Sequence, residues 1–516
     1  MKRIIILSFI IAVYTALVAQ SANVQIKWGD LGKEKFFAPD VDFEVIGATS
    51  SSIYVKKFLG GKSSYFMYDR SLKLIKEIPI DKAFAGWSRE IAPGACYFYD
   101  DYCLQVYFEN NFKEDGSVPT YLAELDVNTM KHKQKEEVGK RYPNTNYQWN
   151  FMGYYVRQSA DKTKFMFLAN DREYKMLNMK NSVADYQVIV YNSKLNKIQE
   201  SKWNYTGSCD RLDVESAIVD NDGNVFVLSK VNSKDLKKST GKGYLYVLVA
   251  LPLNGPATHQ TFEEGENNIG YFELVSSGKG KLQMAGMYSL KRSPSSSIGT
   301  FFCNFNAATG KVEALKFTPY NDELKTKLVR ARAKEELDDV ILLGVEAIPG
   351  GGAVVLTEQT FSPPDNSGNA SYTQHLDIII TRYDEYGKVV WQKNIPKQQR
   401  APTMGTFSSK YYSYFYTFDS EKIRIMFNDD IKNLDNYDGS KTVMCRGFND
   451  ATAMFVDMKV SDGSYKKYPV FKATEANVLL YPGASHALSP NRVIIFAGDI
   501  TGSKIVSFRI GEVTMN

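Results

Sequence analysis

The chain has 516 residues with 63 Lys or Arg and 58 Asp or Glu, so its formal net charge is +5. A nearly balanced charge over this length argues against nucleic acid or an acidic surface as the partner. With 33 Tyr and 30 Phe against 4 His, the composition favours many half-buried strands over a histidine-rich metal site.

Residues 1–19 have the features of a cleaved secretory signal peptide. Lys2 and Arg3 precede an apolar run over residues 4–18, and Leu17-Val18-Ala19 is the expected cleavage site. Cleavage would lower the charge from +5 to +3 and leave no transmembrane segment. The apolar run is near the lower limit for crossing a bilayer, so an uncleaved anchor remains an alternative. No Cys follows it, so we expect a periplasmic or secreted protein, free or associated with the outer membrane, and not a lipoprotein.

Eight pairs of short strands follow along the chain, each joined by a turn. The turns of the clearest copies contain Asp222-Gly223, Gly278-Lys279-Gly280 and Gly350-Gly351-Gly352, because glycine supplies the positive φ that a chain reversal needs. The eight pairs span residues 43–58, 89–109, 154–169, 214–230, 271–287, 340–358, 411–427 and 478–498. The apolar, uncharged run 411–418 is expected to be an innermost strand, since its exposure would invite aggregation.

A β-hairpin follows each of the first seven pairs. Its clearest copy is 376–395, in which two alternating runs flank Asp384 and Gly387. The other hairpins turn near Asp69, Asp126, Asn192, Asn254, Asn306 and Asp457.

A strand pair plus a hairpin makes a four-stranded antiparallel unit, and repetition of such units predicts an all-β fold, a single β-propeller over residues 20–516. The eighth unit lacks one strand, and the orphan strand 23–28 would complete it and close the ring. We therefore expect eight blades, with seven as the alternative. One short surface helix is expected within 323–339, where Leu324, Leu328, Val329 and Leu337 share one side.

Some repeats resemble known propeller families. Residues 159–168 and 489–498 resemble the Ser-Pro-Asp-Gly strand starts of Tol-system-type propellers, and 306–315 and 383–391 resemble the hairpins of quinoprotein propellers. The resemblance covers the repeat skeleton and implies blade geometry without a specific function.

The longest links join the second and third strands of a unit. They span residues 111–120, 171–185, 232–243, 288–299, 360–374 and 428–442. In a propeller these links emerge on the same face as the links between blades, so that face is the expected binding face.

Recognisable catalytic and cofactor signatures are absent from the sequence. It has no GxSxG, HExxH or sialidase box, and only Trp391 fits the tryptophan-bearing hairpins of a quinoprotein enzyme. Residues 60–64 lack the first glycine of a phosphate loop. Asp220 with Asp222, and Asp435 with Asp438, are candidate calcium ligands, and turn formation explains the first pair better. We therefore expect no cofactor and no metal.

The remaining single residues are cysteines, histidines and an aromatic-basic group. Cys96 and Cys103 are the only close cysteine pair and are either a disulfide or buried free thiols. The four histidines, expected to be surface or hairpin residues in separate blades, are His132, His259, His375 and His486. An aromatic-basic cluster near the starts of innermost strands is the candidate ligand or partner site, and it comprises Trp87, Arg89, Tyr147, Trp149, Arg157 and Arg211.

These features favour a non-catalytic propeller of a Gram-negative cell envelope that binds or scaffolds a protein or peptide through its long-loop face. The alternatives are a carbohydrate-active enzyme, in which Asp210, Glu215 and Asp338 would approach the central funnel, and a small-ligand sensor that uses the funnel. A convergent carboxylate pair would favour the enzyme. A glycan remains a second class of partner.

Overall fold

The computed structural model describes most of the chain. The described residues are 24–34, 41–59, 62–79, 96–99, 102–108, 118–141, 154–169, 185–240, 242–278, 280–290, 293, 295–307, 309–328, 336–362, 372–402, 412–499 and 506–516.

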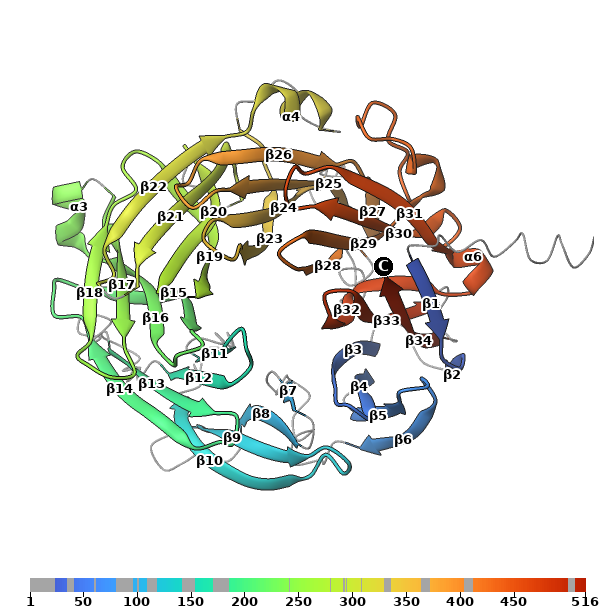
Figure 1. The fold of residues 1–516 in the computed structure, drawn as a ribbon, viewed down its shortest axis with the longest axis horizontal. Helices are drawn as coiled ribbons and strands as arrows, with labels where there is room; N and C mark the ends of the chain where they lie inside the picture. The colour runs from blue at the N-terminus through green and yellow to red at the C-terminus, as the bar shows by residue number, and fades with distance from the viewer. Residues whose placement is uncertain are drawn as a thin grey trace, which may run out of the picture.

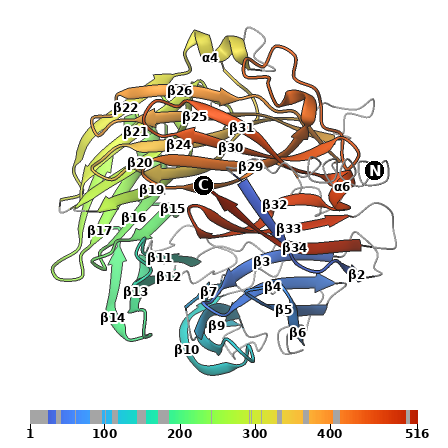
Figure 2. The same ribbon diagram turned by 45° about the vertical axis from the view of Figure 1, so that its right-hand side comes forward.

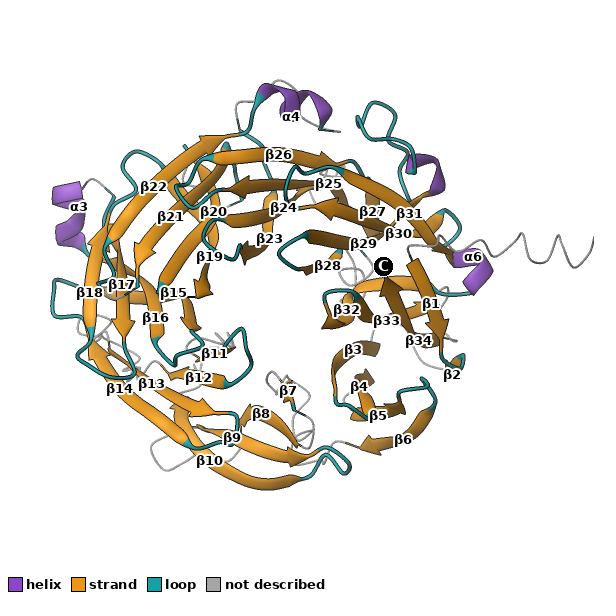
Figure 3. Cartoon of the chain, in the orientation of Figure 1, coloured by secondary structure: helices purple, strands orange, loops and turns teal. Residues whose placement is uncertain are grey.

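Eight antiparallel sheets stand side by side in a ring, so the protein is an eight-bladed β-propeller (Figure 1). The strands of each blade follow one another from the centre of the ring to its rim (Figure 3). The expected eight blades are confirmed, and the seven-bladed alternative is wrong.

Blades 1 to 4 each consist of four consecutive strands. Blade 1 is β3 (Val41–Ala48), β4 (Ser52–Leu59), β5 (Lys62–Asp69) and β6 (Leu74–Pro79). Blade 2 is β7 (Cys96–Phe98), β8 (Tyr102–Phe108), β9 (Val118–Asp126) and β10 (His132–Arg141). Blade 3 is β11 (Tyr154–Gln158), β12 (Lys164–Ala169), β13 (Asp185–Asn192) and β14 (Lys197–Asn204). Blade 4 is β15 (Arg211–Val219), β16 (Val225–Asn232), β17 (Tyr244–Leu251) and β18 (Thr258–Phe262).

Blades 5 to 7 repeat the same arrangement, and blade 6 gains a short strand. Blade 5 is β19 (Asn268–Gly278), β20 (Lys281–Ser289), β21 (Gly299–Asn306) and β22 (Val312–Pro319). Blade 6 is β23 (Val340–Ala347), β24 (Ala353–Phe361), β25 (Tyr372–Tyr383) and β26 (Val389–Ile395), with β27 (Gln399–Pro402) paired to β25. Blade 7 is β28 (Phe415–Phe418), β29 (Lys422–Asp430), β30 (Ala451–Lys459) and β31 (Tyr465–Lys472).

Blade 8 joins the two ends of the chain. β32 (Leu479–Ser489), β33 (Arg492–Asp499) and β34 (Val506–Met515) supply three strands, and β1 (Val24–Trp28) completes the sheet as its outermost strand. β1 pairs antiparallel with β34 from Val24 opposite Met515 to Trp28 opposite Gly511, and β2 (Gly32–Glu34) also pairs with β34. In Figure 2 the blue N-terminal strand lies beside the red strands of this blade. The predicted closure is confirmed, and it removes an open sheet edge.

The hydrophobic core is divided among the junctions between neighbouring blades. Between blades 3 and 4, for example, Val188 and Val190 pack with Val227 and Val249. Side-chain hydrogen bonds also join innermost strands, as where the Tyr97 hydroxyl on β7 donates to the Val156 carbonyl on β11 at 3.1 Å. Each blade therefore needs both neighbours to bury its faces.

The described helices are short and lie at the periphery of the ring (Figure 3). They are α3 (Lys234–Thr240), α4 (Asp322–Lys327), the 3₁₀ turn η3 (Ile431–Asn433) and α6 (Ala473–Ala476). The expected helix is present as α4 but ends earlier than predicted, because Leu328 is extended and Leu337 forms a β-bridge with Ser297. Leu324, Leu328 and Leu337 are nevertheless buried in one cluster.

Candidate functional site

The long-loop face is the face on which the links between second and third strands emerge, together with the links between blades. Its best described parts are residues 233–243 of blade 4, 290–298 of blade 5 and 431–450 of blade 7. The links between third and fourth strands, on the opposite face, are tight turns such as that around Gly387, whose φ is 78°. In blades 4, 5 and 7 the links between second and third strands are therefore longer than the turns between third and fourth strands, as the sequence predicts.

The aromatic-basic cluster can be located only in part. Trp87, Arg89, Tyr147 and Trp149 lie outside the described residues. Arg157 on β11 is exposed, and its guanidinium lies 6.0 Å from the Tyr155 ring. Arg211 begins β15 and pairs with Asp213 at 2.7 Å. These two arginines therefore lie on innermost strands of consecutive blades, Arg211 at the start of β15 but Arg157 near the end of β11. Their role in binding stays a prediction.

The three carboxylates named from the sequence have separate environments. Asp210 precedes β15 and accepts a hydrogen bond from the Lys234 N–H at the start of α3 (2.9 Å). Glu215 lies within β15, and burial, opposed by the charge of Lys230, raises its pKa. Asp338 is exposed in the link before β23.

A different pair of carboxylates meets on the innermost strands of blades 5 and 6. Glu273 of β19 accepts a hydrogen bond from the Val345 N–H at 3.2 Å, which brings it beside Glu346 of β23. The Tyr416 hydroxyl of β28 donates to Glu346 Oε1 at 2.9 Å. Burial, reinforced by the charge of Glu273, raises the pKa of Glu346 to about 7. Sequence analysis missed this pair, because glutamates in strands carry no signal of the neighbour they face.

Fully buried charges anchor the link that leaves blade 6. Glu358, at the end of β24, forms an ion pair with Lys397 at 2.5 Å, and both side chains have no exposed surface. The His375 Nδ1 atom lies 2.9 Å from the second oxygen of Glu358. These partners outweigh burial and lower the pKa of Glu358 to about 2. Lys397 also donates to Gln399, whose amide donates to the Asn428 carbonyl in blade 7 at 2.7 Å.

A second buried group organises the long link of blade 7. Asn433 donates to Asp429 Oδ1 and accepts from the Val443 N–H, both at 2.7 Å. The ammonium of Lys467 donates to the carbonyls of Asn433 and Asn436 at 3.1 and 2.8 Å. Burial raises the pKa of Asp429 to about 7. Buried hydrogen bonds therefore hold the blade 7 link in place.

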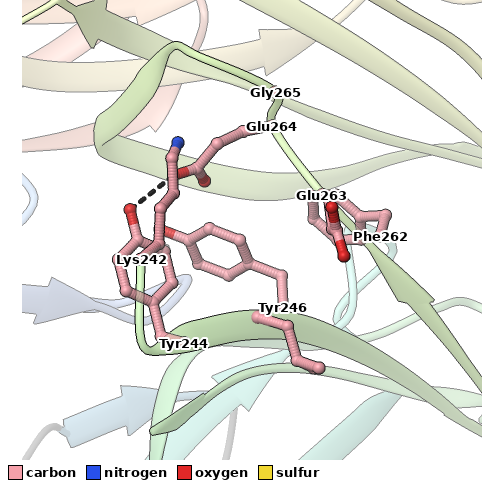
Figure 4. A pocket seen from close by; sticks show the side chains of 8 residues that line it. Lys242, Tyr244, Tyr246, Phe262, Glu263, Glu264 and Gly265 are labelled. Carbon is pink, nitrogen blue, oxygen red and sulfur yellow. Dashed lines mark hydrogen bonds and ion pairs between the residues drawn. The ribbon is translucent and has the colours of Figure 1, made fainter. Parts of the chain in front are cut away.

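A small pocket opens at the end of blade 4 on the long-loop face, between the second-to-third strand link of this blade and the link that leads to blade 5 (Figure 4). Lys242 and Tyr244 come from the second-to-third strand link of blade 4 and the start of β17, and Phe262, Glu263 and Glu264 come from the end of β18 and the link to blade 5. Glu264 is 3% exposed and forms an ion pair with Lys242 at 2.9 Å. The pocket combines charged and aromatic side chains in a partly enclosed space.

The structure shows the surroundings of two histidines, His375 and His486, and of one candidate calcium pair. His375 is half-buried on β25, the first strand of the blade 6 hairpin, whereas His486 is half-buried on the innermost strand β32, which corrects the expectation of a surface or hairpin position for His486. Burial lowers the pKa of His486 to about 4. Asp220 accepts hydrogen bonds from the N–H groups of Asp222 and Asn224, as a hairpin turn requires. Within the described ranges, no three His, Cys, Asp or Glu side chains are grouped as metal ligands.

Cys96 and Cys103 are not joined by a disulfide in the structure. They lie on adjacent strands, but Cys96 is opposite Gln105 and Cys103 is opposite Phe98, so the two cysteines are diagonal neighbours. Burial raises the pKa of the Cys103 thiol well above its ordinary value. No helix in the described part of the chain has the length and apolar character needed to cross a bilayer.

Comparison with known proteins finds no family and only distant structural similarity. No family model and no curated protein matches the chain. Similar solved structures include a prolyl endopeptidase (TM-score 0.41, 10% identity, 92% of this chain and 55% of the peptidase). Others are the WD40 domain of SCAP from fission yeast (0.38, 9%, 94% and 98%) and the Pyrococcus horikoshii acylaminoacyl peptidase (0.35, 7%, 90% and 59%). The chain spans about half the length of the prolyl endopeptidase. At these identities the similarity carries no functional argument.

Proposed function

We propose that this protein is an exported, non-catalytic β-propeller that binds or scaffolds a protein or peptide partner in the bacterial cell envelope through its long-loop face. The observation that carries the proposal is the buried polar framework beneath that face. Glu358 and Lys397 lose all contact with water, and Asn433 and Lys467 hold the blade 7 link through hydrogen bonds. Buried charges are costly, so such a framework is suited to keeping long loops in one conformation for recognition.

Exposed apolar side chains on the same face supply contact area. Leu290, in the blade 5 link, is 54% exposed. Ile431 and Tyr437, in the blade 7 link, are 37% and 42% exposed. Protein interfaces draw most of their affinity from a few such apolar or aromatic anchors.

The test is an affinity pull-down with the tagged protein, expressed from the full chain, from detergent-solubilised envelope. We expect a stoichiometric partner with the wild type and its loss with the Leu290→Ser/Ile431→Ser variant. The matched control is Tyr386→Ser, because Tyr386 is 72% exposed but lies in a turn on the opposite face. Partner recovery that is equal for all three proteins would exclude the long-loop face, and recovery of no partner would exclude the scaffold. Cell fractionation with N-terminal sequencing tests export.

One observation favours a second candidate, a carbohydrate-active enzyme acting on the innermost strands. Glycoside hydrolysis needs one protonated and one ionised carboxyl group, and a pKa of about 7 would keep Glu346 partly protonated near neutral pH beside Glu273. Hydrolysis of a panel of aryl glycosides, lost in Glu346→Gln and kept in Glu313→Gln, would support this candidate. Glu313 is the control because it lies on the outermost strand β22. No hydrolysis of any glycoside would reject it.

A further inference from the structure

The pocket at the long-loop end of blade 4 contains a carboxylate of which one oxygen has a hydrogen-bond partner and the other has none. Glu264 Oε1 accepts from the Tyr244 hydroxyl and lies 2.9 Å from the Lys242 ammonium. Glu264 Oε2 is buried and has no hydrogen-bond partner. An unpaired buried carboxylate oxygen is energetically unfavourable, so the site is incomplete without a hydrogen-bond donor. Figure 4 shows Glu264 reaching over the Tyr246 ring, beside Lys242.

We propose that this pocket binds the primary ammonium group of a lysine side chain presented by the partner, an inference that rests on the proposed function for the existence of that partner. The ammonium would donate to Glu264 Oε2. Charge-assisted hydrogen bonds of this kind are about twice as strong as neutral ones.

The charge of the lining favours a cation over a neutral donor. Glu263 and Glu264 contribute two carboxylates, and Lys242 contributes one ammonium. These three side chains carry one net negative charge, which one bound cation would neutralise. Lys230 does not supply it at this oxygen, because its ammonium lies over the Tyr244 ring at 3.9 Å and its charge acts on Glu215.

The walls and the size favour a primary ammonium in particular. Tyr244 attracts a cation through its ring face, as its contact with the Lys230 ammonium at 3.9 Å shows, while Tyr246 and Phe262 stack on each other and form an apolar wall. The cavity volume is about 30 Å³, which is room for a group the size of one water molecule or one ammonium. The planar guanidinium of arginine is larger.

The position of the pocket supports a lysine that arrives on a partner. Lys242 and Glu264 belong to two links of the long-loop face, so a side chain can enter from that face without displacing a strand. Lys242 also donates to the Asn267 carbonyl, which fixes it at one side of the site.

The experiment titrates the wild-type protein with Nα-acetyl-lysine methylamide and follows binding by saturation-transfer NMR. We expect saturable binding that weakens at least tenfold in Glu264→Gln and about threefold in Glu263→Gln. The matched control Glu266→Gln removes the same charge from the same link, but Glu266 is exposed and does not line the pocket, so its affinity should equal that of the wild type. The Nε-acetylated probe, which has no charge, should not bind.

Three results would overturn the inference. They are no binding of the lysine probe, equal affinity for wild type and Glu263→Gln, and binding of butylamine without binding of the lysine probe, which would indicate a free-amine site. Glu263→Gln keeps the test decisive if Glu264→Gln does not fold, because Glu263 is exposed.

The pull-down separates this inference from the proposed function. A partner retained equally by wild type and Glu264→Gln would leave the scaffold standing and overturn the role of the pocket in it. Probe binding without any envelope partner would reject the scaffold and with it the partner-borne lysine.

Discussion

Replacement of Lys397 by methionine should destabilise the protein strongly, because it leaves a buried carboxylate without its main counter-charge. Lys397 Nζ lies 2.5 Å from Glu358 Oε1, and neither side chain has exposed surface. Methionine preserves most of the volume, so the loss is mainly electrostatic. In Lys397→Met, Glu358 keeps His375, at 2.9 Å, as its basic partner among the described residues.

The magnitude follows from the pKa of Glu358. Its pKa falls from an ordinary 4.5 to about 2 in the folded protein. At about 1.4 kcal/mol per pH unit, this difference corresponds to about 3 kcal/mol of stability at pH 7. Breaking one side of a buried ion pair typically costs about 3–5 kcal/mol, which agrees. We therefore expect the free energy of unfolding to fall by about 3 kcal/mol in Lys397→Met.

The assay is urea denaturation followed by tryptophan fluorescence at pH 7 and pH 3. The folded-state pKa of Glu358 is below the unfolded value, so its contribution is complete above about pH 4.5 and is lost as the pH falls toward about 2. The difference between wild type and Lys397→Met should therefore shrink at pH 3. The double variant Glu358→Gln/Lys397→Met should recover most of the loss. A loss below about 1 kcal/mol at pH 7, or a difference that stays constant between the two pH values, would refute the reasoning.

Three other predictions concern single features of the fold. Burial raises the pKa of Asp429 from 3.8 to about 7, so this group favours the folded state at low pH and its contribution is lost between about pH 4 and 7. Asp429→Asn should flatten that part of the urea-midpoint profile, and an unchanged slope would contradict the assignment. A Cβ at position 344 would lie 1.9 Å from the Tyr416 hydroxyl, so Gly344→Ala should lower the melting temperature by disrupting the Tyr416–Glu346 hydrogen bond, at a cost of about 1–3 kcal/mol. An unchanged melting temperature would show that Tyr416 moves without cost. Deletion of residues 24–28 exposes the edge of β34 and should convert monomer to aggregate in size-exclusion chromatography, whereas a stable monomer would mean that the closing strand is dispensable.

Much of the architecture could be predicted from the sequence, because strands and turns depend on neighbouring residues. Alternation of apolar and polar residues predicted the strand pairs, and glycine marked the reversals, as the positive φ angles of Gly223 (92°) and Gly350 (90°) confirm. The apolar run 411–418 was assigned to an innermost strand, and Phe415–Phe418 is β28, the innermost strand of blade 7. The orphan strand at the N-terminus also predicted closure, since a unit one strand short needs a partner for its edge.

The candidate site depended on contacts that the sequence does not encode locally. Glu358 meets Lys397 because the link that leaves blade 6 folds back over β24. Glu273 reaches Glu346 because the ring sets β19 beside β23, and a register shift between Leu342 and Gly344 interrupts the alternation on which sequence reasoning relies. The sequence shows Glu264 only as part of an acidic run directly after a strand. That run does not indicate that Lys242 and Tyr244 contact one carboxylate oxygen of Glu264 and that the other has no hydrogen-bond partner.

By itself the sequence determined a closed all-β ring of repeated four-stranded units with its long links on one face, because those properties follow from residue periodicity, turn chemistry and link length. It favoured eight units over seven, and the structure decided for eight. The tertiary structure alone decided which charged side chains are buried together and which buried oxygen lacks a partner. The physical reason is that burial and pairing depend on the curvature of the ring and the register of neighbouring strands, which bring together residues such as Glu273 and Glu346 that are far apart in the chain.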